Sequence, residues 1–253
     1  SGLMTFFSGA YFACIFIFID RKVFVERKKD KKKVAELTED PLKSGHKLLY
    51  ALFLGFLGLL YAAYGALEVS FSTYLLTFAV KYLNWTKKAA ANVVSALMGS
   101  FMGGRALGIL LIIFLQPSVM LFGDLISMVV VLSILCAFVS MHQAVLWICA
   151  ICLGFAMATF YGTGFTWTEQ RIGTRAKVSA LMLISSALGE MSGPAMTGPL
   201  MGKVGYFSFA YFNLTLAAVS LFSLIALELL SFKVSIRPKP AVTEVEGSEA
   251  IAE

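Results

Sequence analysis

The sequence has few of the residues with which soluble enzymes work. Only 14% of its 253 residues are charged and only two are histidine, whereas 58% are hydrophobic. It contains no H-E-x-x-H, G-x-S-x-G or P-loop motif, and His46 and His142 have no cysteine or acid arrangement that suggests a metal site. We therefore expect neither an enzyme nor a metal site, and no cofactor beyond a coupling ion.

The sequence also lacks the cysteines of an extracellular disulfide framework. Its four cysteines, Cys14, Cys136, Cys149 and Cys152, all lie within apolar runs. Cys149 and Cys152 have C-x-x-C spacing, but a redox or zinc motif is not expected in a helix at lipid depth. We interpret the cysteines as small apolar packing residues.

Long apolar runs dominate what is present. A bilayer core of roughly 30 Å needs about 20 helical residues, and seven runs reach or approach that length. The first run is short and the sequence does not begin with Met, so we expect a piece of a longer protein. The pattern predicts an all-α polytopic membrane protein with helices at 3–19, 48–80, 89–115, 119–139, 144–165, 178–201 and 206–232.

Basic residues are concentrated on one side of the predicted membrane. Ten of the 21 Lys and Arg residues lie at 21–47. If that loop is cytoplasmic, sixteen basic residues lie inside and four outside, which follows the positive-inside rule. We therefore expect anionic membrane lipids rather than nucleic acid beside this loop, and a protein of the plasma membrane.

The spacing of the runs predicts four parts. We expect a transmembrane helix at 1–19, a basic cytoplasmic loop at 20–47, a six-helix bundle at 48–232 and a disordered cytoplasmic tail at 233–253. The six helices form two triplets. Because three is an odd number, the second triplet enters the membrane in the opposite orientation to the first. This is the 3+3 inverted repeat of transporter halves.

Polar and aromatic side chains recur at helical spacing on the first helix of each triplet. Hydroxyls, a carboxylate and aromatic rings suit a sugar, whose hydroxyls need donors and acceptors and whose C–H face stacks on a ring. For any single Ser or Thr, the alternative is a hydrogen bond to its own helix backbone. The predicted substrate-binding residues are Tyr61, Tyr64, Glu68, Ser72, Thr159, Thr163 and Trp167.

Glu68, Arg105 and Glu190 are the three charges at membrane depth. A charge at the bilayer centre costs at least about 2.5–3.5 kcal/mol, so each must face a partner or water. We expect Arg105 to pair with Asp124 in a gating or structural role. Glu190 lies one turn before Pro194, where we expect an irregular or bent helix. We predict that Glu190 couples transport to Na⁺ or H⁺; the alternative is a protonated carboxyl that only ties helices together.

Three segments resemble one family. Residues 101–108, FMGGRALG, resemble the G-R-x-x-G of the eighth helix of the major facilitator superfamily. Residues 64–71, YGALEVSF, resemble the seventh helix of its sodium-dependent glucose transporter and fucose permease-like branch. Residues 188–194, LGEMSGP, are similar to the eleventh-helix G-E-M-x-x-P of the sodium-dependent glucose transporter type. The resemblance covers about 48–232, which implies the C-terminal six-helix half of such a protein.

The resemblance implies uptake of a hexose such as glucose by alternating access, coupled to sodium. It also implies that residues 3–19 are the sixth helix and that earlier helices of the same protein are partners. The charged loop motif expected after the eighth helix is reduced here to LQPSVML at 115–121. Two alternatives stay open: a carrier of another small solute, and a seven-helix receptor, although the N-P-x-x-Y motif is absent.

Overall fold

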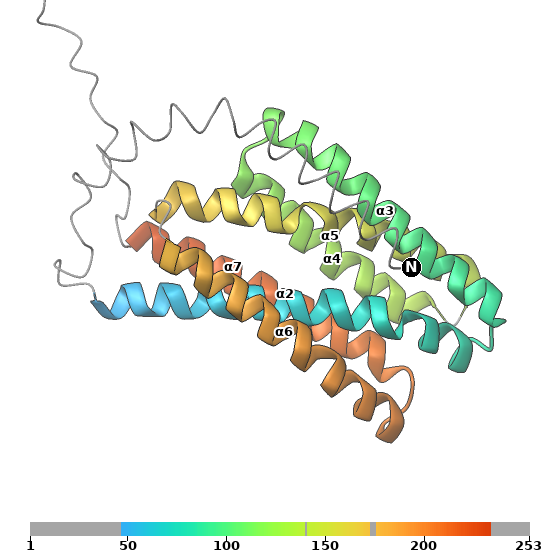
Figure 1. Ribbon diagram of the computed structural model, residues 1–253. Helices are drawn as coiled ribbons and strands as arrows, with labels where there is room; N and C mark the ends of the chain where they lie inside the picture. The colour runs from blue at the N-terminus through green and yellow to red at the C-terminus, as the bar shows by residue number, and fades with distance from the viewer. Residues whose placement is uncertain (1–46, 140, 173–175, 234–253) are drawn as a thin grey trace, which may run out of the picture. The chain divides into compact units, whose positions relative to one another are not determined.

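The computed structural model describes residues 47–139, 141–172 and 176–233 (Figure 1). The expected helix at 1–19 and nearly all of the loop at 20–47 and of the tail at 233–253 lie outside these residues. Predictions about those parts therefore stay untested. The described part contains six α-helices and no strand: α2 (Lys47–Lys81), α3 (Lys87–Phe114), α4 (Pro117–Phe138), α5 (Gln143–Ile172), α6 (Ala176–Lys203) and α7 (Ser208–Lys233).

Each of the last six predicted spans is one helix, so the all-α prediction is confirmed. The largest difference is in α5, which continues to Ile172 rather than ending at 165. Five described helices are long and apolar enough to cross a membrane; α6 does not reach the required hydropathy, because it is rich in Gly, Ser and Pro. Five of the predicted spans thus have both the length and the hydropathy of a transmembrane helix, and α6, with 28 residues, has the length alone.

Short turns with local hydrogen bonds join the helices. Asn84 has a φ of 56°, a left-handed conformation that asparagine tolerates better than most residues. The Thr86 hydroxyl then accepts a hydrogen bond from the Ala89 N–H at 3.3 Å and caps the start of α3. Pro117 opens α4, where a missing N–H costs nothing. These residues set the reversals of the chain between α2, α3 and α4.

Helix α6 contradicts the expectation of irregular backbone at its prolines. It is helical from Ala176 to Lys203 with Pro194 and Pro199 inside it. Each proline removes one hydrogen bond from the helix ladder, yet the surrounding helices hold the segment helical. One such contact is the Tyr74 hydroxyl of α2, which donates to the Pro194 carbonyl at 3.2 Å. The expectation of irregular backbone was therefore wrong, whereas a bend of the helix at this point stays a prediction.

The helix contacts repeat when the two triplets are exchanged. Helix α3 packs on α5, and α6 packs on α2 (Figure 1). Helix α4 packs on α5, and α7 packs on α2 through Phe209, which lies 5.3 Å from Phe71 between ring centroids. Helices α4 and α7 contact each other. This exchange of equivalent contacts is the pattern expected of a 3+3 inverted repeat.

Glycines at four-residue spacing bring α6 against α2 at backbone distance. A Cβ on Gly189 would collide with the Ala62 carbonyl, and one on Gly193 would lie 2.6 Å from the Ala66 carbonyl oxygen. On α3, a Cβ on Gly104 would lie 3.2 Å from the Phe155 Cα. Small residues at this spacing allow close helix approach in membranes. The close approach places Glu190, next to Gly189, at the junction of α2, α5 and α6.

Candidate functional site

Hydroxyl and carboxyl groups from α5 and α6 meet around Glu190. The Ser186 hydroxyl, one turn before Glu190 on α6, donates to Glu190 Oε1 at 2.9 Å. The Tyr161 hydroxyl of α5 donates to the same oxygen at 3.2 Å and lies 2.5 Å from Ser186 Oγ. Ser186 is buried, whereas the Glu190 side chain is exposed on the surface of the described helices. We call Tyr161, Ser186 and Glu190 the oxygen triangle.

Glu68 of α2 lies beside the oxygen triangle. Its side chain is partly buried, and its Oε2 is buried without a hydrogen-bond partner among the described residues. The charge of Glu68 interacts with the charges of both Arg105 and Glu190. Two carboxyls and one guanidinium from α2, α3 and α6 thus lie near enough to interact electrostatically, as expected of charges that must find partners at membrane depth.

The aromatic residues predicted to bind substrate lie in the core. Tyr64 is fully buried, stacks on Phe160 with ring centroids 3.7 Å apart, and donates its hydroxyl to the Met157 carbonyl at 2.7 Å. Tyr61 is 1% exposed, and its hydroxyl lies against Gly164. Trp167 is fully buried and stacks on Phe53. In this conformation all three rings are therefore buried.

Most of the hydroxyls predicted to bind substrate donate hydrogen bonds to backbone carbonyls of their own helix. Ser72 donates to the Glu68 carbonyl at 2.9 Å, and the buried Thr163 donates to the Thr159 carbonyl at 2.9 Å. These are the local backbone bonds weighed as the alternative to solute binding. Thr159 instead donates to Asp124 Oδ2 at 2.7 Å and joins α5 to α4. A role for these residues in substrate binding stays a prediction.

Arg105 and Asp124 stay a predicted pair. Arg105 holds its guanidinium carbon 4.3 Å from the centre of the Phe101 ring, a cation–π geometry within its own helix. Asp124 accepts the hydrogen bond from Thr159. The electrostatic partner of Arg105 identified above is Glu68 on α2. This electrostatic interaction links Arg105 to the surroundings of the oxygen triangle, which the sequence reasoning did not anticipate.

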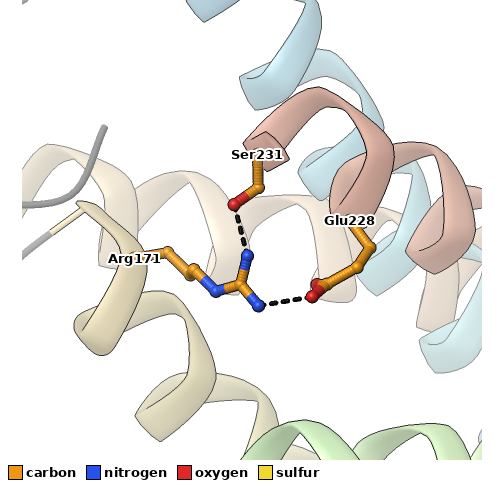
Figure 2. A network of polar contacts seen from close by, with 3 residues as sticks. All are labelled: Arg171, Glu228 and Ser231. Atoms are coloured by element: carbon orange, nitrogen blue, oxygen red, sulfur yellow. Dashed lines mark hydrogen bonds and ion pairs between the residues drawn. The ribbon is translucent and has the colours of Figure 1, made fainter. Parts of the chain in front are cut away.

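A second polar network, which the sequence reasoning missed, joins the ends of α5 and α7 (Figure 2). Arg171 forms an ion pair with Glu228 at 2.5 Å and donates to the Ser231 hydroxyl. Its guanidinium also lies over the Trp167 ring, 5.2 Å from the centroid. The sequence analysis had no means of pairing Arg171 with residues nearly 60 positions away on another helix.

Tyr161 and Ser186 are the other residues that sequence reasoning missed. The hydroxyl stripe of α5 was drawn through Thr159 and Thr163, which left out the tyrosine between them. Ser186 lies four residues before Glu190, so helical spacing already places the two on one face. That spacing was the available signal for Ser186. No comparable signal pointed to Tyr161, because its partners come from another helix.

Comparison with known proteins shows which proteins this chain resembles in sequence. The chain is 30% identical to sodium-dependent glucose transporter 1 of Homo sapiens over 206 residues, which is 80% of this chain and 37% of that protein. The chain is related to sodium-dependent glucose transporters. It is also 28% identical to sodium-dependent glucose transporter 1 of Xenopus laevis over 195 residues, 77% of this chain and 39% of that protein. No protein-family profile matches the chain.

These relatives and the apolar helices identify an integral, multi-pass membrane protein. Sodium-dependent glucose transporter 1A of Mus musculus is 33% identical over 155 residues. The chain spans less than two fifths of the length of these three relatives, with 39% as the largest share. The resemblance seen in the sequence is therefore confirmed, while the activity of the whole protein is a matter for proposal.

Proposed function

We propose that this chain is part of a secondary transporter that moves a hexose such as glucose across the membrane by alternating access, driven by sodium. The observation that carries the proposal is the similarity to sodium-dependent glucose transporter 1 over 80% of the chain. The inverted exchange of helix contacts supports it, since transporter halves are built from such repeats.

The oxygen triangle supplies the chemistry that a coupling cation needs. Glu190 Oε1, Ser186 Oγ and Tyr161 Oη lie within 2.5–3.2 Å of one another. Hard cations take oxygen ligands, and a carboxylate among them offsets the positive charge. The exposure of Glu190 on the described helices leaves it open to a cation. Glu68, which interacts electrostatically with Arg105 and Glu190, lies beside it.

The solute is proposed to bind beside the triangle, on α2 and α5, the first helices of the two triplets, where the predicted substrate-binding residues lie. Alternating access requires this bundle to rock against another part of the transporter, and the chain spans only 37% of the human relative. We therefore propose the remaining helices of the same protein, together with membrane lipids, as its partners. The transporter names of the relatives favour this function over a receptor or an enzyme.

Uptake of radiolabelled glucose by the complete native protein tests the proposal. Proteoliposomes carrying the protein are given glucose in sodium buffer or in choline buffer of equal ionic strength. We expect saturable uptake in sodium and little in choline. Uptake that is equal in both buffers would reject sodium coupling, and no saturable uptake would reject the sugar.

A further inference from the structure

Tyr161 differs from the two tyrosines beside it because its side chain is only partly buried. Tyr61 and Tyr64 are at most 1% exposed, whereas Tyr161 is only partly buried. Its ring stands edge-on to Tyr64, with centroids 5.2 Å apart and planes at 89°. The neighbouring Gly162 has no heavy atom within 4 Å of a Cβ built on it, so this side of α5 is open. Of these three tyrosines, Tyr161 is therefore the one that the described helices leave open to a solute.

The hydroxyl of the same side chain belongs to the oxygen triangle. It has one hydrogen, and its two partners are Ser186 Oγ and Glu190 Oε1. The Ser186 hydrogen is already directed at Glu190 Oε1. The three oxygen–oxygen contacts thus share only two hydroxyl hydrogens, those of Tyr161 and Ser186. Both hydrogens stabilise the Glu190 carboxylate, either directly or through the Ser186 hydroxyl. Without a cation, the Tyr161 hydrogen is engaged inside the protein.

A cation at Glu190 changes where that hydrogen can go. A sodium ion bound by the three oxygens attracts their lone pairs and repels their hydrogens, so the hydroxyl hydrogens must turn outward. The Tyr161 hydrogen then needs another acceptor. A sugar lying against the Tyr161 side chain presents hydroxyl oxygens that are such acceptors, and its C–H surface suits the ring itself. Sodium binding would thereby create a hydrogen-bond donor for the solute.

We propose that Tyr161 couples the two ligands: its ring contacts the sugar, and its hydroxyl donates to the sugar only when sodium occupies Glu190. The proposal deepens the proposed function and depends on it. It makes Tyr161 a substrate-binding residue and Ser186 a positioning residue that holds the Tyr161 hydroxyl against Glu190. Because coupling between two binding sites is reciprocal, sodium raises sugar affinity and sugar raises sodium affinity by the same factor.

The test compares Tyr161→Phe with Tyr74→Phe in the complete native protein. Both variants remove one tyrosine hydroxyl that contacts α6, but the Tyr74 hydroxyl bonds to the Pro194 carbonyl and not to the triangle. The Michaelis constant for radiolabelled glucose is measured in proteoliposomes at low and at saturating sodium, with choline as the replacement. Ser186→Ala is measured in the same way.

In the wild type we expect the glucose constant to fall roughly tenfold or more between low and saturating sodium, as a hydrogen bond gained by a charged site allows. In Tyr161→Phe we expect the constant to stay within about twofold of the low-sodium wild-type value at both concentrations. Tyr74→Phe should keep the wild-type fall. Ser186→Ala should reduce the fall, because Tyr161 then keeps only its longer contact with Glu190.

Two results would overturn the inference. One is a Tyr161→Phe protein whose glucose constant still falls with sodium as in the wild type. The other is a full fall in Ser186→Ala, which decides the matter if Tyr161→Phe does not reach the membrane. A wild type that transports no glucose, or transports it without sodium, contradicts the proposed function instead, so the two failures can be told apart.

Discussion

Two helix pairs of this bundle use the same packing and carry opposite charges. Helix α3 meets α5 through Gly104 and Gly108, and α6 meets α2 through Gly189 and Gly193. In each case a charged residue directly follows the first glycine: Arg105 on α3 and Glu190 on α6. The repeated part is therefore the backbone contact, which any close helix pair needs. The two repeats differ in the charge of the residue beside this contact. Glu190, the acidic residue, accepts hydrogen bonds from two hydroxyls.

The largest expected effect comes from breaking the tighter of the two pairs. Gly189→Val places a side chain against the Ala62 backbone, which cannot move aside, so we expect loss of most folded protein. Gly202→Val on the same helix is the control, because no heavy atom lies within 4 Å of its added Cβ. Fluorescence-detected size-exclusion chromatography of both variants measures this. Equal recovery of the two proteins would contradict the packing described here.

Removing the acidic charge should come next in size and affect function alone. Glu190→Gln keeps the shape and can still accept hydrogen bonds from Ser186 and Tyr161. We expect normal folding and glucose exchange but no sodium-driven accumulation, measured in proteoliposomes with an imposed sodium gradient. Accumulation at the wild-type level would leave Glu190 a purely structural residue.

The looser pair should tolerate the same disruption better. A Cβ on Gly104 would lie 2.6 Å from the Ala158 Cβ, a side-chain atom, and 3.2 Å from the Phe155 Cα. We expect Gly104→Val to lower thermal stability by about 1–3 kcal/mol, less than Gly189→Val. Gly99→Val is its control, with no heavy atom within 4 Å of the added Cβ. A Gly104→Val protein that is lost as completely as Gly189→Val would make the two pairs equivalent.

The smallest effect is expected at the ion pair of the second triplet. Arg171 and Glu228 are both partly exposed, with side-chain accessibilities of 27% and 23%. Such pairs contribute about 1 kcal/mol or less. We expect Arg171→Met to lower the melting temperature slightly, and Arg171→Met with Glu228→Met to recover part of the loss because no carboxylate is left unpaired. A double variant less stable than either single one would contradict this.

The helices could be predicted from the sequence because membrane depth requires long apolar runs, and each run has one plausible structure. The sequence could not predict which face of each helix packs in the protein core, since lipid and protein core are equally apolar. The polar stripe of α2 therefore predicted solute contact for Tyr61 and Tyr64, whose rings pack against α5 in this structure; that role stays a prediction. Similarly, Pro194 indicated irregular backbone by its local chemistry, whereas α6 is helical throughout and the Tyr74 hydroxyl of α2 bonds to the Pro194 carbonyl.

Residues of the site were predictable where one helix supplies them. Glu190 was found because a carboxyl at membrane depth is costly, and Ser186 was within reach of the same reasoning through its spacing of four. The contacts of Tyr161 and the electrostatic interaction of Glu68 with Arg105 depend on how α2, α3, α5 and α6 pack, which spacing along one helix does not encode. The site thus forms only when helices of the first triplet pack against helices of the second.

The packing of the first triplet against the second also constrains the order in which the helices can assemble during synthesis. The glycine face of α3 finds its partner on α5, and the face of α2 that receives α6 waits until Ala176–Lys203 has been synthesised. The first triplet, α2–α4, cannot complete these contacts when it leaves the ribosome, so its glycine contacts with the second triplet stay unmade until α5–α7 have been synthesised. A ribosome that stalls after α4 would leave an insertion intermediate with both glycine contacts unmade, the kind of substrate that membrane quality control removes.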